Sequence, residues 1–169
     1  MEMRAIRRRQ HKNRRWIIGI LLALIGIFVV GYSIIGTALR PINQANREYS
    51  ALAIKKKQVV SVNTFYWNSR DHTYYTVVGI NKKHQPVAVI IEKHTKKMQT
   101  VKLADGISYE AVKKQIKTKY QPKRITNIGM AIYKTVPVWE VTFIDQNGNL
   151  NFITVQFSNG NEVRTIQNL

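Results

Sequence analysis

The chain has 169 residues, and 44% of them are apolar, so the composition is that of a folded protein rather than a disordered chain. It carries 27 Lys and Arg against 9 Asp and Glu, a formal net charge of +18. Cysteine is absent, which excludes disulfides, thiolate nucleophiles, cysteine metal sites and lipid attachment through cysteine. A charge this large is typical of proteins that neutralise nucleic-acid phosphates, so its position along the chain decides what it means.

The N-terminal segment predicts a membrane anchor. Residues 1–15 form a basic tail, and residues 16–39 carry no charge. As a helix those 24 residues would span about 36 Å, enough to cross a hydrocarbon core of about 30 Å. A cleaved signal peptide has a shorter apolar stretch, so we favour an uncleaved anchor. The basic flank predicts a cytosolic N-terminus and an extracytoplasmic remainder in a single-pass protein of the cell membrane.

Small residues recur along one face of this helix at steps of four and three. They are Gly19, Ala23, Gly26, Val30, Ser33 and Thr37. Small residues let a second helix approach closely, which suggests a packing face for a partner or a second copy. The alternative is that the stripe is incidental, because Gly is common in membrane helices.

From residue 40 onward, 20 Lys and Arg stand against 8 Asp and Glu, a net charge of +12. Outside the cell this charge argues against nucleic acid as a partner. Anionic wall polymers and lipid head groups become the candidates, beside the simpler interpretation of a solvated basic surface.

The extracytoplasmic part predicts two amphipathic helices. Residues 43–58 and 109–120 have apolar residues at helical spacing and lysines on the other face. The predicted buried stripes are Ala45, Tyr49, Leu52 and Ala53 in the first helix, and Tyr109, Val112, Ile116 and Tyr120 in the second. Ser108 is the expected N-cap of the second helix, and Pro122 ends it.

The remaining segments predict antiparallel strands rich in Val, Ile, Thr and Tyr. They are residues 59–67, 73–80, 87–92, 125–133, 138–144 and 150–157, with a last hairpin returning through 162–166. Asn147-Gly148 and Asn159-Gly160 are hairpin turn signals, because Asn and Gly tolerate positive φ.

The two halves correspond when the first is shifted by 64 residues, which places Asn81 on Asp145 and Ile91 on Val155. We therefore predict an α+β fold, in which the transmembrane helix is followed by two tandem units, residues 43–103 and 104–169. Each is a helix packed on an antiparallel β-meander.

Candidate catalytic chemistry is sparse. No pair of the four histidines has helical metal-ligand spacing, and Ser69, Asp71 and His72 lie too close together to form a triad. Glu140 lies in the middle of a strand, where we expect it on the solvent face beside a lysine. We predict no catalytic, metal or cofactor-binding residues. Four aromatic side chains are candidates for exposed contacts, namely Trp67, Tyr74, Tyr75 and Trp139.

The order of segments, the start Asp105-Gly106-Ile107-Ser108 followed by Ala111, and the strand Pro137-Val138-Trp139-Glu140-Val141 resemble the TseB-like (YpmB-like) proteins of Gram-positive bacteria. The resemblance covers nearly the whole chain. It implies tandem PepSY-like, cystatin-like units and a non-enzymatic regulator of cell-wall (peptidoglycan) elongation that acts on a penicillin-binding protein. The alternatives are a domain that binds wall polymers or anionic lipids, and a peptidase inhibitor or chaperone like other PepSY-like domains.

Overall fold

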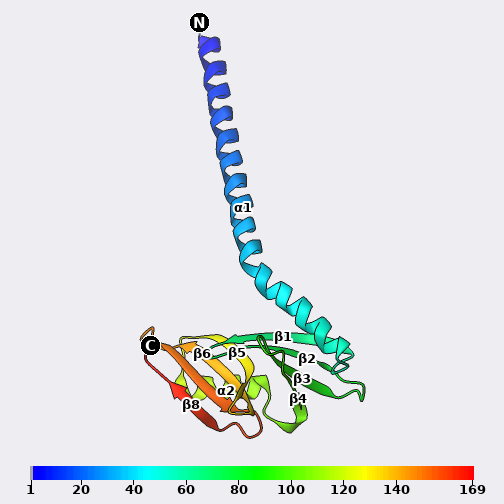
Figure 1. Ribbon diagram of the computed structural model, residues 1–169. Helices are drawn as coiled ribbons and strands as arrows, with labels where there is room; N and C mark the ends of the chain where they lie inside the picture. The colour runs from blue at the N-terminus through cyan, green and yellow to red at the C-terminus, as the bar shows by residue number, and fades with distance from the viewer. Residues whose placement is uncertain (1) are drawn as a thin grey trace. The chain divides into compact units, whose positions relative to one another are not determined.

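A computed structural model describes residues 2–169, except the side chains of residues 2–15, 17, 18, 34, 35, 38 and 39. The chain divides into two compact units, an N-terminal unit, Met1–Asn43, and a C-terminal unit, Gln44–Leu169. Helix α1 (Glu2–Lys55) forms all the described residues of the first unit and the start of the second. The C-terminal unit holds two four-stranded sheets and is the part that carries the site described below (Figure 1).

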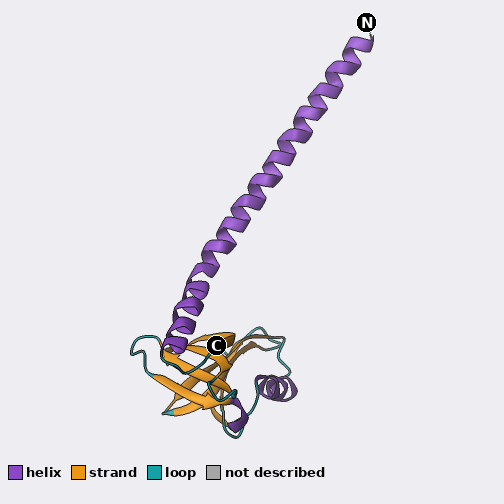
Figure 2. Cartoon of the chain, turned by 90° about the vertical axis from the view of Figure 1, so that its right-hand side faces the viewer, coloured by secondary structure: helices purple, strands orange, loops and turns teal. Residues whose placement is uncertain are grey.

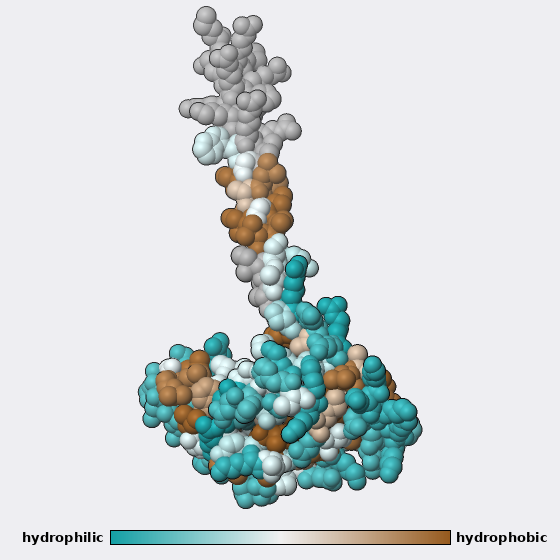
Figure 3. All heavy atoms as spheres, viewed as in Figure 1, coloured by the Kyte–Doolittle hydropathy of each residue, from teal (hydrophilic) through white to brown (hydrophobic). Residues whose placement is uncertain are grey.

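The N-terminal unit is helical throughout its described residues, and Pro41 lies inside α1 instead of ending it. Hydrophobic residues are exposed along this helix (Figure 3), and the aromatic side chains of Phe28 and Tyr32 are 79% and 82% exposed. Over the residues that are described, no helix meets the length and hydropathy needed to cross a membrane. The side chains of the predicted basic tail, residues 1–15, and of six residues of the predicted span lie outside the described residues.

In the C-terminal unit, the last turns of α1 cover one face of the first sheet. This sheet is a meander of β1 (Ser61–Ser69), β2 (Thr73–Ile80), β3 (Pro86–Glu92) and β4 (Met98–Lys102). Ala45, Tyr49 and Ala53 are buried against inward-facing β2 and β3 residues such as Val77 and Val89. The predicted apolar stripe of the first helix is therefore correct, and Leu52 packs at its margin.

The second sheet repeats the arrangement with β5 (Arg124–Tyr133), β6 (Val136–Ile144), β7 (Leu150–Gln156) and β8 (Glu162–Ile166). Helix α2 (Tyr109–Tyr120) packs beside it (Figure 2) and buries Val112 and Ile116. The Ser108 side chain accepts a hydrogen bond from the Ala111 backbone N–H at 3.2 Å, so Ser108 is the N-cap that the sequence predicted. The short helix η1 (Leu103–Asp105) links the two halves.

The 64-residue correspondence extends to individual hydrogen bonds in the turns. In the β2–β3 turn, Oδ1 of Asn81 accepts from the backbone N–H groups of Lys83 and Gln85. In the β6–β7 turn, Oδ1 of Asp145 accepts from those of Asn147 and Asn149. His84 and Gly148, which also lie 64 residues apart, both have positive φ, 58° and 91°. The first turn thus has the geometry of the second without its glycine.

Strand β4 is the element that the sequence analysis did not assign. Residues 98–102 contain two lysine or glutamine positions and only one β-branched aliphatic residue, so their pattern is weak. Residues 98–102 form a strand because they pair with β3, from Val87 opposite Lys102 to Ile91 opposite Met98. Their own β-propensity is too weak to predict it.

Candidate functional site

The two sheets meet at a polar contact built on one row of residues across the second sheet. Cross-strand pairing places Gly129 opposite Glu140, Glu140 opposite Thr154, and Thr154 opposite Arg164. Directly paired residues of an antiparallel sheet project from the same face. The face is the one turned away from Val141 and Ile153, which pack toward α2. One strand position in each of β5, β6, β7 and β8 therefore contributes to a single surface.

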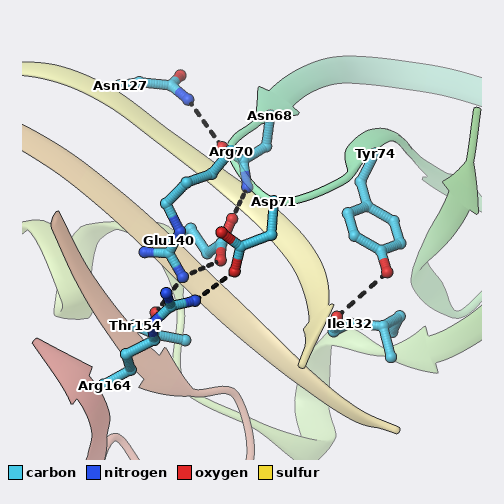
Figure 4. A network of polar contacts seen from close by, with 9 residues as sticks. All are labelled: Asn68, Arg70, Asp71, Tyr74, Asn127, Ile132, Glu140, Thr154 and Arg164. Atoms are coloured by element: carbon cyan, nitrogen blue, oxygen red, sulfur yellow. Dashed lines mark hydrogen bonds and ion pairs between the residues drawn. The ribbon is translucent and has the colours of Figure 1, made fainter. Parts of the chain in front are cut away.

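The tip of the β1–β2 hairpin, residues 67–73, supplies the other half of this contact. Arg70 Nη2 lies 2.5 Å from Glu140 Oε1 and donates a hydrogen bond to Thr154 Oγ1 at 2.8 Å. Asn68 Nδ2 donates to the other carboxylate oxygen, Oε2 (Figure 4). The Glu140 carboxylate is thus held at both oxygens by side chains from the first sheet.

A third tie lies at the outer end of the row. The Asp71 carboxylate forms an ion pair with the Arg164 guanidinium, again joining the hairpin tip to the second sheet (Figure 4). Its members are more exposed than the first pair, at 52% and 31% of the side-chain surface against 9% and 10% for Glu140 and Arg70. The inner pair is therefore desolvated, while the outer pair is open to screening by salt.

Glu140 is the residue for which the sequence expectation is wrong. It does not lie on a solvent face beside a lysine, but is 7% exposed and pairs with an arginine 70 positions earlier in the chain. Strand alternation correctly puts it opposite the core face. It cannot show that a hairpin of the other sheet covers that second face.

A hollow of about 340 Å³ adjoins the polar contact. Asp71, His72 and Tyr74 line it from the β1–β2 hairpin, residues 132–135 line it from the β5–β6 hairpin, and Glu140 reaches it from the second sheet. Across it, the Tyr74 hydroxyl donates to the Ile132 carbonyl at 3.2 Å (Figure 4). Burial raises the pKa of Tyr74, and the nearby Glu92 and Glu140 carboxylates raise it further.

The four predicted contact aromatics divide between surface and core. Trp67 is 40% exposed and Tyr74 is half-buried. Trp139 and Tyr75 are buried, at 2% and 7%, so neither is an exposed contact. Trp139 faces the α2 side and its indole N–H donates to the Ile107 carbonyl at 3.0 Å, whereas Tyr75 packs against Tyr49 under α1.

The residues of the small-residue stripe are exposed along α1 in the N-terminal unit. An added Cβ at Gly19 or Gly26 would meet nothing within 4 Å among the described residues, so a larger side chain there is sterically free within this chain. The predicted stripe is thus present as an open face, and its use as a packing surface stays a prediction.

The described part of the chain contains no cluster of three or more His, Asp or Glu side chains that could hold a metal ion. His72 approaches Glu92 at 3.7 Å through Nδ1, and it is 63% exposed. Ser69 bonds Thr73 instead of His72. The Ser69–Thr73 contact joins the two ends of the β1–β2 turn.

Comparison with known proteins gives three matches. A family model described as "Cell wall elongation regulator TseB-like domain" matches residues 50–92, the end of α1 through β3. A curated relative from Bacillus subtilis (strain 168), "Probable cell wall elongation regulator TseB", is 25% identical over 146 residues, which cover 86% of this chain and 91% of that protein. The solved structure of the YpmB protein from Bacillus subtilis matches with a TM-score of 0.60 and 26% identity, over 70% of this chain and 93% of that one. The arrangement of helices on antiparallel sheets is consistent with a cystatin-like fold.

Proposed function

Because the family model, the curated relative and the solved structure support a TseB/YpmB-like family for this chain, we propose that the protein is a non-enzymatic regulator of cell-wall elongation. The observation that carries this proposal is the relative's named role together with a match over most of both chains. In the described C-terminal unit, the buried charged groups Arg70 and Glu140 are engaged with each other. They serve to join two sheets.

We further propose that the protein works from the cell membrane, with its N-terminus in the cytosol. The support is the uncharged run of residues 16–39 after a basic tail, and the wide exposure of that run's described side chains. An exposed apolar helix of this length is costly in water and stable in lipid. The C-terminal unit would then lie outside the membrane, where wall synthesis takes place.

The proposed partner is a penicillin-binding protein, reached through the small-residue face of α1 or through the C-terminal unit. Mild crosslinking in growing cells followed by purification of the tagged full chain tests this. Recovery of a penicillin-binding protein together with altered cell length on deletion is expected. Recovery of none, with normal cell shape on deletion, would contradict the proposal.

A matched pair of variants separates the two routes of contact. Gly19→Ile, Ala23→Ile and Gly26→Ile together block close helix approach on the stripe. Leu21→Ile and Phe28→Ile alter the opposite side of the same helix and are the control. If recovery of the partner falls with the first set only, the helix carries the contact. If neither set changes it, the stripe is incidental and does not carry the contact.

A second candidate function rests on the charge of the C-terminal part, 20 Lys and Arg against 8 Asp and Glu. Lys114 and Lys117 are exposed on α2, and Lys123 and Arg124 are exposed just beyond it. Such a surface would bind an anionic wall polymer through its phosphates or carboxylates. Because counterions are released, that binding would weaken steeply as salt rises, and salt-insensitive retention on purified wall would exclude it.

A further inference from the structure

The contact of the β1–β2 hairpin tip with the second sheet is polar, whereas the bodies of the two sheets are joined by apolar packing. Ala88 and Ile90 of the first sheet are buried in one cluster with Ile128 and Met130 of the second. The tip itself is tied through Asn68, Arg70 and Asp71. When a polar contact opens, water forms hydrogen bonds with both groups. The net free energy that the contact contributes is therefore small.

Arg70 makes the closed position of the tip costly. Its side chain is 10% exposed, and Nε and Nη1 are buried with no hydrogen-bond partner among the described residues. A guanidinium this far from solvent loses much of its hydration. The ion pair with Glu140 recovers only part of that loss, because desolvating two charges offsets their attraction.

The surroundings of the tip leave room for it to move. The hollow of about 340 Å³ lies between His72 of the tip and the β5–β6 turn at Lys134 and Thr135. Just beyond the tip, Tyr74 reaches across it to the Ile132 carbonyl. Within the turn, the backbone hydrogen bond from the Arg70 N–H to the His72 carbonyl is long, at 3.4 Å. Ladder pairing of Asn68 with Tyr74 and of Ser69 with Thr73 holds the hairpin together, so the position of its tip over the second sheet is set by the side chains that touch that sheet.

We infer that the β1–β2 hairpin tip is a latch that closes over Glu140 and Thr154 and can lift while the two sheets stay packed. Arg70 is its inner tie and the Asp71–Arg164 pair its outer tie. Lifting hydrates Arg70 and uncovers the face of the second sheet that carries Glu140, Thr154 and Phe152, over whose ring the Arg70 guanidinium lies at 6.0 Å. This inference stands on the geometry alone and does not depend on the proposed function.

Spin labels on the full-length chain test the latch directly. His72→Cys and Lys134→Cys place labels on the two hairpins that face each other across the hollow, and the chain contains no other cysteine. The distribution of distances between the labels, measured by electron paramagnetic resonance in detergent micelles, should show a short population and a minor longer one. A single short population in every variant would overturn the inference.

Two variants should shift these populations by different amounts. Glu140→Gln turns an N–H₂ group toward one of the donors, Asn68 or Arg70, and so removes one hydrogen bond to a charged group. The longer population should rise about tenfold. Arg70→Met with Glu140→Leu removes both charges and the two buried N–H groups, but also the acceptor of the Asn68 amide, so it should raise the longer population less than Glu140→Gln does. If the double variant opens as far as Glu140→Gln, the pair is a simple structural tie and the latch is excluded.

A control and a milder variant complete the test. Glu162→Gln removes an ion pair with Lys119 that lies within the second half of the chain, and it should leave the label distances unchanged. Asp71→Asn weakens only the exposed outer tie, so it keeps the fold even if Glu140→Gln does not. It should still raise the longer population, and an unchanged distribution in this folded variant would contradict the inference.

Discussion

Gly129 on β5 lies directly beneath Asn68 of the β1–β2 hairpin. A Cβ added at Gly129 would lie 3.0 Å from the Asn68 Cβ and 3.5 Å from the Trp67 carbonyl oxygen. The backbone of the second sheet can therefore approach the first only because residue 129 has no side chain. Asn68 reaches the Glu140 carboxylate from this position.

Gly129→Ala should destabilise the C-terminal unit. The added methyl must push Asn68 away from Glu140 or shift the two sheets, and overpacking of this kind costs about 1–3 kcal/mol. Urea unfolding followed by circular dichroism measures the loss. Gly36→Ala is the control, since nothing lies within 4 Å of a Cβ there. Equal urea midpoints for Gly129→Ala and the unaltered chain would show that the hairpin does not pack closely against β5 at residue 129.

Arg70 and Glu140 should be strongly coupled in stability. Removing either partner alone, by Arg70→Met or Glu140→Leu, leaves a buried charge unpaired and should cost about 3–5 kcal/mol. The double variant should cost clearly less than the sum of the two single variants, because it leaves no charge unpaired. It should still cost about 1–3 kcal/mol, because Asn68 loses the carboxylate to which its buried amide donates. A double-mutant cycle from urea unfolding gives the coupling, and additive single effects would contradict it.

Local patterns were sufficient to predict most of this fold, because each helix and turn is specified by its neighbours in sequence. Ser108 caps α2 and Val112 and Ile116 face the core, as their spacing indicates. The duplicated turns at Asn81 and Asp145 correspond in their hydrogen bonds. Strand β4 was missed because tertiary pairing, not its own sequence, orders it.

The site could not be predicted in the same way. Its ties join residues 70 and 93 positions apart, and neither Arg70 nor Asp71 stands out in a polar turn rich in such side chains. The same limitation explains why Trp139 and Tyr75 were wrongly predicted to be exposed. Strand alternation assigns each residue to one of the two faces of its sheet, but it does not show which face another element covers. The only local signal was Glu140 itself, a carboxylate in the middle of an otherwise apolar strand.

His84→Gly should stabilise the protein, and Gly148→Ala at the matching position should destabilise it. Both residues occupy positive φ at the same place in duplicated turns, where a non-glycine residue costs roughly 1–2 kcal/mol. The gain from His84→Gly is partly offset by the greater entropy of glycine in the unfolded chain, so we expect less than about 1 kcal/mol. Thermal unfolding of both variants measures the difference, and a loss of stability in His84→Gly would contradict the strained turn.

Stability should fall above about pH 10, the ordinary pKa of tyrosine. Burial raises the pKa of Tyr74, and the Glu92 and Glu140 carboxylates add to it. Burial also raises the pKa of Tyr120, and its hydrogen bond to Glu162 adds to that. Because the folded state binds these protons more tightly, their contribution is complete below the unfolded pKa and is lost as the pH rises through the folded values.

Urea unfolding between pH 8 and pH 11.5 measures this loss, with tyrosinate absorbance at 295 nm reporting ionisation in the same samples. Tyr74→Phe removes one of the groups responsible, so its stability should fall less steeply over that interval, although it starts lower because the hydrogen bond to Ile132 is gone. Tyr32→Phe, at a residue 82% exposed in the N-terminal unit, is the control. If Tyr74→Phe and the unaltered chain lose stability in parallel, Tyr74 does not hold its proton more tightly in the folded protein than in the unfolded chain.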